Sequence, residues 1–573
     1  MSGEGTDNLN TGSLKGSLEN TFFSRFVRKY NSLPSTQVAL AVCAIYISFI
    51  VVMLFFHEPW TDEAQAWMIA KYASYQEMLF TIPHYEGHPP FLYLIYSIPA
   101  KLGLPFRPVI QMLHLISVAV MVGIVEFRLG LTNIVKTFLP FTVFFVQYSV
   151  MSRPYVSLIC MLFLVLSMKK TRNDEPVRYV LALGLLCCTH LYGIAIAGGI
   201  AISWLTDIAI TGKKFFKDLF SSNRKRLFAL CGLLVFALIE ILTIFPADDC
   251  YSILGSWNDL SFGRLLTSLG NLLLILPSEM TVTNLDYSLS SGNYSTPGII
   301  ILPVISITIW ILLFMRAQRT KTLRDIIPPL LCFMAVGVMY LFYHHYGVYL
   351  ALLVYCFIVT RDASAENKRP VVLSIGITAF LFMSVFWTGI YCFDEITSKC
   401  YPGSDLNSWI DENNIRDYNW MSFCGSDSPN MVSEPVIAAD AEYGKLLCSN
   451  YFLNRPYVSW IKLSEEQKRE AFAEWGRSGA PDFIIVNTPL NYPITDITDR
   501  LGVSDDYVPV FFGYYRYFVK GCKIEIIVHI WMRKDLEDSV SVRKEFGDYR
   551  RLVEGGVYDY LGVMKNTAQG PAE

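Results

Sequence analysis

The stretch Glu58-Pro-Trp-Thr-Asp62-Glu63-Ala-Gln-Ala-Trp67 directly follows the first long apolar run of the sequence, Gln37 to Phe56. An apolar run of about 20 residues is long enough to cross a membrane as a helix. Two adjacent carboxylates, flanked by tryptophans, therefore stand where that helix would reach water. The same polar loop continues to His84-Tyr-Glu-Gly-His88-Pro-Pro90. We interpret this loop as the candidate site and the apolar runs around it as the scaffold.

The composition is that of a polytopic α-helical membrane protein. Of the 573 residues, 53% are apolar and only 17% are charged, and the mean hydropathy is positive. A soluble domain rarely combines these values. The net charge of −3 gives no indication of a nucleic-acid partner, and we predict none. Membrane lipids are the first partners that the composition predicts.

Further apolar runs predict about 11 transmembrane helices. They cover residues 37–56, 108–127, 137–152, 154–168, 178–191, 192–210, 227–245, 297–315, 326–342, 346–360 and 371–391. The segment Pro89–Leu104 would be a twelfth span, but placing it flat on the membrane surface keeps the basic loops on one side. The loop cations left on the other side are then Lys71, Lys101, Arg107, Arg153 and Arg264. The positive-inside rule therefore predicts a cytoplasmic N-terminus in a multi-pass protein of the plasma membrane.

These assignments divide the chain into a short cytoplasmic segment, a transmembrane domain with two large outer loops, and a soluble extracytoplasmic α/β domain. Their ranges are 1–36, 37–391 (with loops 57–107 and 246–296) and 392–573. In the last part, the short apolar runs Pro435–Ala439 and Asp482–Val486 are typical of buried parallel strands. Two long β-rich runs follow at Tyr507–Lys520 and Lys523–Arg533. Disulfides such as Cys392–Cys400 are possible in that compartment, but spacing does not decide the pairing.

Ionisable residues gather on one side of the membrane in this topology. The outer face receives His57, His84, His88, His114, His190, His344 and His345. Arg153 lies there too, between two spans in Ser152-Arg-Pro-Tyr155. Ionisable groups at a membrane are costly unless they are paired or functional. We therefore predict that the outer mouth of the helix bundle is the functional site.

The order of these features resembles the GT-C superfamily of membrane glycosyltransferases, which includes protein O-mannosyltransferases and the aminoarabinose transferases of lipid A. The shared pattern is a span, a loop opening with Asp-Glu, a His-Pro-Pro segment leading into an interfacial helix, and a span ending in Ser-Arg-x-Tyr. It is clearest over Phe56–Tyr192. The resemblance implies a GT-C fold and an inverting glycosyltransferase. The donor would be a sugar linked to polyprenyl phosphate, and the acceptor a hydroxyl of a protein, glycan or lipid.

By this resemblance Asp62 is the catalytic base and Glu63 is the second acidic residue. The candidate substrate-binding residues are His84, His88, Arg153, Tyr155, His190, His344 and His345. The family commonly has an arginine for the donor phosphate where this chain has Tyr343-His-His-Tyr-Gly347, so His344 and His345 replace it or Arg153 carries more of the charge. A cofactor is not assigned. A divalent metal held by Asp62, Glu63 and one of the loop histidines is an open alternative.

Other functions of the protein stay open beside this hypothesis, as do purely structural roles for the candidate site residues. A second candidate is an enzyme that transfers another group from a lipid phosphate, such as a phosphoryl-alcohol unit. A transporter is the third, but its polar residues would lie near the membrane midplane on broken helices. An Asp-Glu pair such as Asp62 and Glu63 is often a helix cap. His84 and His88 could make hydrogen bonds within the loop, and Arg153 could hold lipid headgroups.

Overall fold

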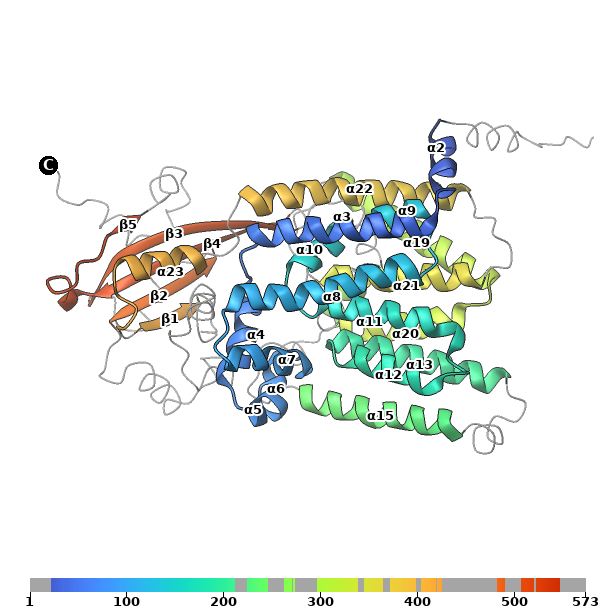
Figure 1. The fold of residues 1–573 in the computed structure, drawn as a ribbon, viewed down its shortest axis with the longest axis horizontal. Coiled ribbons are helices and arrows are strands. Elements are labelled where there is room, and N and C mark those ends of the chain that lie inside the picture. The colour runs from blue at the N-terminus through green and yellow to red at the C-terminus, as the bar shows by residue number, and fades with distance from the viewer. Residues whose placement is uncertain are drawn as a thin grey trace, which may run out of the picture.

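The computed structural model describes residues 22–211, 224–245, 262–270, 272–273, 296–338, 345–363, 371–397, 403–418, 420–424, 482–489, 506–519 and 522–546. Within them, long helices lie side by side, and a five-stranded sheet stands at one end of the bundle (Figure 1). The short helices of the Asp62 loop gather at the same end. The helix α2 (Phe22–Asn31) lies at the opposite end (Figure 1).

Most helices of the bundle follow the predicted spans within a few residues. They are α3 (Ser35–Phe56), α8 (Phe106–Arg128), α11 (Tyr155–Met168), α12 (Pro176–Cys187), α13 (Leu191–Thr211), α15 (Arg224–Ile244), α19 (Thr296–Arg319), α20 (Leu323–Gly337), α21 (Tyr346–Asp362) and α22 (Val371–Thr397). The last of these continues past the domain boundary predicted at residue 392. In the described part of the chain, four helices are long and apolar enough to cross a membrane, namely Ser35–Phe56, Phe106–Arg128, Leu191–Ile208 and Leu227–Ile244.

The surface of the bundle is apolar. Large hydrophobic side chains point outward along its helices, and Phe55 and Phe228 are 77% and 71% exposed. An apolar surface of this extent is unfavourable in water and favourable in lipid. The protein is therefore an integral membrane protein with a mostly helical, polytopic fold. The number of spans and their orientation stay predictions.

One predicted span, residues 137–152, is not a single helix. It consists of α9 (Asn133–Phe138) and α10 (Val143–Val150), and the segment between them contains Pro140. Proline inside a helix removes a donor and clashes with the preceding turn, so the helix breaks there. Two side chains of α22 bind the freed backbone: the Val143 N–H donates to the Ser384 hydroxyl (3.1 Å), and the Thr388 hydroxyl donates to the Phe141 carbonyl (2.7 Å). Non-helical backbone is tolerated in a membrane where protein covers it.

The loop at residues 57–107 folds into four helices, α4 (Thr61–Tyr72), α5 (Tyr75–Phe80), α6 (Pro83–Glu86) and α7 (Phe91–Lys101). The segment that we predicted to lie on the membrane surface is α7, and it packs against α4. The buried Trp67 ring of α4 contacts Tyr96 of α7, with ring centroids 6.4 Å apart. The Lys101 ammonium donates to the Ala73 carbonyl at 2.6 Å. Because aromatic burial contributes strongly to packing, α4 is a fixed platform for its first-turn carboxylates.

The C-terminal region contains a mixed sheet with strands in the order β1-β2-β4-β3-β5. The strands are β1 (Trp420–Cys424), β2 (Phe483–Pro489), β3 (Tyr507–Val519), β4 (Cys522–Arg533) and β5 (Glu545–Phe546). Helix α23 (Gly403–Glu412) packs on the sheet through Trp409, whose ring lies 5.1 Å from that of Phe511. The predicted run at residues 482–486 is β2, which is parallel to β1 and antiparallel to β4. The run 435–439 and Cys400 lie outside the described residues.

Candidate functional site

Asp62 and Glu63 occupy the first turn of α4, where the helix dipole favours negative charge. The two neighbouring side chains have different partners. The Asp62 side chain is 37% exposed, and its Oδ2 lies 3.2 Å from Nη2 of Arg153. The Glu63 side chain is 1% exposed, and its Oε2 lies 2.9 Å from Nε2 of His57. Asp62 is therefore open to a reactant, whereas Glu63 is enclosed by protein.

Arg153 approaches Asp62 from the break between α10 and α11. Pro154 follows it, and α11 begins at Tyr155. The buried guanidinium also donates to the Asp62 carbonyl (3.0 Å) and to Nε2 of His88 (3.1 Å). A guanidinium is permanently charged and donates in a planar fork, so it fixes both the backbone and the carboxylate of Asp62. A buried arginine needs a nearby anion, and Asp62 provides one.

Glu63 belongs to a buried chain of charges. Its two oxygens accept hydrogen bonds from Nε2 of His57, from the Trp60 N–H (2.7 Å) and from the Ser152 N–H (2.6 Å). The other ring nitrogen of His57 lies 2.6 Å from Oε1 of Glu395, on the last turn of α22. These contacts join α3, α4, α22 and the α10–α11 break at one point.

The charges in this chain follow from competing effects on the pKa. Burial alone would lower the pKa of His57, but the Glu63 and Glu395 carboxylates outweigh it and raise that pKa to about 10. Burial alone would raise the pKa of Glu63, but the His57 charge and the hydrogen bonds from His57, Trp60 and Ser152 hold it below its usual value. His57 is therefore a buried imidazolium between two carboxylates.

A third carboxyl group, Glu86 of α6, lies close enough to Asp62 and Arg153 for their charges to act on it. Its oxygens accept hydrogen bonds from Nε2 of Gln65 (2.5 Å) and from the Tyr93 hydroxyl (3.2 Å). Burial raises the pKa of Glu86 to about 7 and the Asp62 charge adds to this, against the lowering by Arg153 and the two hydrogen bonds. Asp62 thus has two buried carboxyl groups nearby, Glu63 and Glu86, whereas its own side chain is partly exposed.

Buried histidine and tyrosine rings surround Arg153 and His88. The centroid of the His88 ring lies 4.5 Å from that of His190, and the Tyr155 ring lies 5.6 Å from His190 and 5.7 Å from His345. The Tyr192 hydroxyl is 3.3 Å from Nδ1 of His345. These rings come from the loop, from α11, from the start of α13 and from the start of α21. Imidazole N–H and phenol O–H groups can donate hydrogen bonds to anionic oxygens.

The structure brings most of the predicted site residues together. Asp62, His88, Arg153, Tyr155, His190 and His345 form one cluster, which we call the Asp62 site, with Glu63 buried beside it. His84 contacts a different element, with Nδ1 at 2.5 Å from the Phe245 carbonyl at the end of α15. His344 lies outside the described residues. The catalytic and binding roles of all these residues stay predictions.

The suggested metal ligands, Asp62, Glu63 and a loop histidine, are not placed around one point. Both oxygens of Glu63 face His57 and backbone N–H groups instead of Asp62. In the described part of the chain, no group of three or more histidine, cysteine, aspartate or glutamate side chains is placed to hold a metal ion. A divalent metal at Asp62, Glu63 and a loop histidine stays an untested prediction.

Sequence reasoning did not select Glu86, Tyr192 or Glu395. Glu86 lies between the two loop histidines in the stretch quoted above, and that position was the available signal. Tyr192 follows His190 at the break between two spans. Glu395 lies 338 residues from His57. A carboxylate at the end of the last span was the available signal, and nothing in the sequence identifies its partner.

No protein-family model matches this sequence, and no curated protein matches it. Two solved structures are similar to it. ArnT from Cupriavidus metallidurans bound to undecaprenyl phosphate is 13% identical, with a TM-score of 0.41, over 86% of this chain and 98% of that chain. The apo state of the same protein is 12% identical, with a TM-score of 0.35, over 85% of this chain and 98% of that chain. At such low identity and TM-score the likeness concerns the general course of the chain and assigns no role to any residue.

Proposed function

We propose that this protein is an inverting glycosyltransferase that moves a sugar from a polyprenyl-phosphate-linked donor to an acceptor hydroxyl. The observation that carries the proposal is the ion pair between the accessible Asp62 carboxylate and the buried Arg153 guanidinium. A base and a fixed cation thus stand side by side at one end of an apolar bundle. Such a bundle suits a lipid-linked substrate, and the resemblance of the sequence to the GT-C superfamily implies the same reaction.

In the proposed step the acceptor oxygen attacks the anomeric carbon of the sugar while its proton passes to the Asp62 carboxylate. The bond between the anomeric carbon and the phosphate oxygen breaks, and its electron pair leaves with the lipid phosphate. A single displacement of this kind inverts the anomeric configuration. A positioned general base typically contributes about 10²–10⁴-fold to the rate.

Arg153 serves both sides of this step. Before the transfer, its guanidinium orients the Asp62 carboxylate through the contacts described above. When that carboxylate takes the proton, the ion pair loses its negative partner. The charge of Arg153 then stabilises the departing phosphate at the moment when negative charge develops there. The neighbouring imidazole and phenol groups supply further donors for phosphate oxygens.

Glu63 acts in this proposal as a positioning residue. One of its oxygens holds the N–H of Ser152, the residue directly before Arg153. Asp62 and Glu63 therefore both grip the same short segment from adjacent positions on α4. This double contact sets the distance between the base and the cation, on which the rate depends steeply.

The test incubates purified full-length protein with a panel of polyprenyl-phosphate sugars and with peptide, glycan and lipid acceptors. We expect consumption of one donor, and a rate about 10²–10⁴-fold lower for Asp62→Asn. Glu77→Gln is the matched control, because this carboxylate lies in the same loop and binds the exposed Ser74 N–H, a role that glutamine keeps. If every donor stays intact, the transferase proposal fails. If Asp62→Asn works at the wild-type rate, the assignment of the base fails.

A related enzyme, which transfers another group from a lipid phosphate, is separated by the same assay. It would leave all sugar donors intact and consume a lipid phosphate that carries the other group. Its dependence on Asp62 would not distinguish it, because both reactions need a base for the acceptor hydroxyl. The identity of the consumed donor decides between them.

A further inference from the structure

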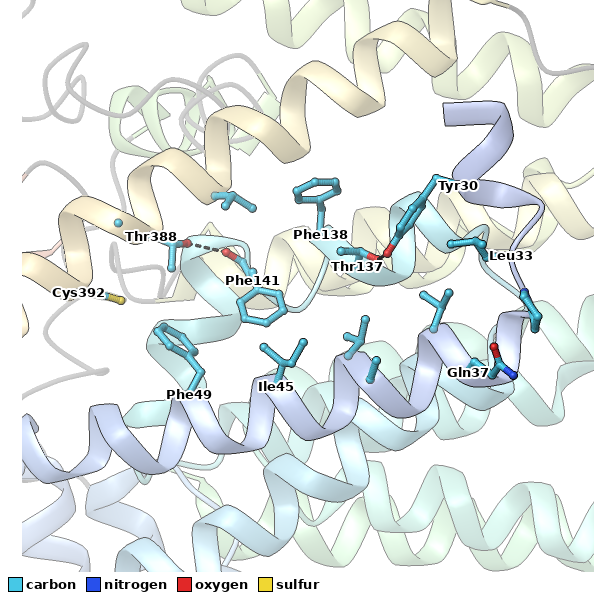
Figure 2. A pocket seen from close by; sticks show the side chains of 16 residues that line it. Tyr30, Leu33, Gln37, Ile45, Phe49, Thr137, Phe138, Phe141, Thr388 and Cys392 are labelled. Carbon is cyan, nitrogen blue, oxygen red and sulfur yellow. Dashed lines mark hydrogen bonds between the residues drawn. The ribbon is translucent and has the colours of Figure 1, made fainter. Parts of the chain in front are cut away.

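An apolar groove runs along the bundle between α3 and α22. Figure 2 shows its side chains, with Tyr30, Leu33 and Gln37 at one end and Phe49, Thr388 and Cys392 at the other. Its volume is about 700 Å³, within the range of about 300–1,000 Å³ that is common for ligand sites. Within the described part of the chain, its lining shares no residue with the Asp62 site.

The groove has the length of a single lipid acyl chain. Between Gln37 and Phe49 a helix rises about 18 Å at about 1.5 Å per residue. The hydrocarbon core of a bilayer is about 30 Å thick, so one leaflet contributes about half of this length. Two hydrogen bonds bind hydroxyl groups at the ends of the groove: Tyr30 and Thr137 share one of 2.6 Å, and Thr388 donates one to the Phe141 carbonyl (Figure 2). The walls between these ends are formed by apolar side chains such as Ile45 and Phe138.

Helix α2, whose Tyr30 lines one end of the groove, also carries three cations. Arg25, Arg28 and Lys29 are spaced on one face of the helix and are exposed, whereas Tyr30 of the same helix lines the groove. The sequence of α2 alternates these cations with phenylalanine and valine in an amphipathic pattern. A short amphipathic helix of this kind lies in the membrane interface, where its cations attract anionic headgroups.

We propose that the groove binds an anionic phospholipid, with one acyl chain between α3 and α22 and the phosphate on Arg25, Arg28 and Lys29. A zwitterionic lipid would fill the groove with the same chain but would lack the net charge that α2 attracts. Each basic residue near the surface strengthens the binding of an anionic headgroup about fivefold. The preference for an anionic over a zwitterionic lipid therefore measures the contribution of α2.

The proposed lipid braces the two helices that support the Asp62 site. Cys392, at the end of the groove, lies one helical turn before Glu395 on α22. Glu395 binds His57, which follows the last residue of α3. A chain that fills the space between α3 and α22 thus stabilises the positions of both partners in this ion pair.

The test uses full-length protein in detergent micelles and phosphatidylglycerol with a photoactivatable diazirine on one acyl chain. We expect the label on peptides from α3 and α22. A tenfold excess of plain phosphatidylglycerol should remove most of the label, and the same excess of phosphatidylcholine should remove little. Equal competition by the two lipids would overturn the proposal. Stronger competition by a polyprenyl phosphate would also overturn it, because the groove would then hold the tail of the sugar donor.

Two sets of variants separate the chain site from the headgroup site. Gly389 lines the groove, and a Cβ there meets no atom within 4 Å, so Gly389→Phe should fill the groove and lower the labelling. Gly232→Phe on α15 is the control: its side chain also enters open space, and the labelling should stay at the wild-type level. Replacing the three α2 cations by glutamine should abolish the preference for phosphatidylglycerol and leave the bundle intact. The same change at the exposed Arg128, Arg178 and Arg319 should preserve it. If neither Gly389→Phe nor the α2 substitutions change the labelling or its preference for phosphatidylglycerol, the proposed site is refuted.

Discussion

Replacing Glu395 by glutamine tests whether His57 is a buried cation. The pKa of His57 rises from its ordinary 6.5 to about 10 in the folded protein. At about 1.4 kcal/mol per pKa unit, this shift corresponds to roughly 5 kcal/mol of stabilisation. Because the folded pKa lies above the unfolded one, the stabilisation is complete below about pH 6.5 and is lost as the pH rises towards 10.

The expected magnitude follows from the two carboxylates that His57 contacts. Glu63 stays in place in the Glu395→Gln variant, and glutamine still accepts a hydrogen bond from Nδ1, so about half of the shift should remain. We expect a loss of about 2–3 kcal/mol in the free energy of unfolding at pH 7. This is somewhat less than the 3–5 kcal/mol that breaking a buried ion pair typically costs.

The assay is thermal unfolding of the purified protein in one detergent at pH values from 6 to 10. The Tm of the wild type should fall across this range, and the Tm of Glu395→Gln should start lower and fall less. The difference between them should therefore shrink as the pH rises. Glu537→Gln is the control, because this exposed carboxylate pairs with exposed Lys544 and should change stability by less than about 0.5 kcal/mol. An equal difference at pH 7 and pH 10 would refute the buried cation.

Three further variants test the Asp62 site and its support. Arg153→Lys keeps the charge but loses the fork that holds the carboxylate and carbonyl of Asp62, so kcat should fall about 10–100-fold in the donor assay. Gly347→Ala should lower the free energy of unfolding by about 1–3 kcal/mol, because a Cβ there would lie 2.5 Å from Cε2 of Tyr148. Glu86→Gln should stabilise the protein above pH 7, because burying the ionised form of a carboxyl with a pKa of about 7 is unfavourable. The free energy of unfolding should rise by up to roughly 3 kcal/mol, which a higher Tm would show.

Each of these predictions has an outcome that contradicts it. Wild-type kcat in Arg153→Lys would mean that a point charge is sufficient and that the fork geometry is not used. Unchanged stability in Gly347→Ala would mean that the tyrosine has room to move. The gain from Glu86→Gln should shrink as the pH falls below 7 and vanish well below pH 4.5, where the wild-type carboxyl is protonated in both the folded and the unfolded state, so a gain that persists there would have another cause.

The helices could be predicted closely because the length of an apolar run is a local property of the sequence. α3 and α8 begin and end within two residues of the predicted spans. The break between α9 and α10 could not be placed in the same way. The run is apolar on both sides of Pro140, and proline is common enough in membrane helices that it does not by itself end a span. The hydroxyls of α22 that bind the freed backbone come from the far end of the chain.

The candidate site could be predicted in part for the same reason. Asp62, His88 and Arg153 stand out because they are polar residues at the ends of apolar runs. The sequence could not show that Asp62 is partly exposed and Glu63 buried, because these environments depend on partners from other parts of the chain. Glu395 in particular is distant in sequence and belongs to no motif.

The contact between His57 and Glu395 joins the first long helix of the bundle to the last, and this has a consequence for biogenesis. During synthesis α3 leaves the ribosome long before α22. His57 therefore cannot contact Glu395 until almost the whole membrane domain has been made. A chain that ends before Glu395 lacks the contact between His57 and Glu395 beside α4. The contact that links the first turn of α4 to α22 through His57 can therefore form only after α22 has been made.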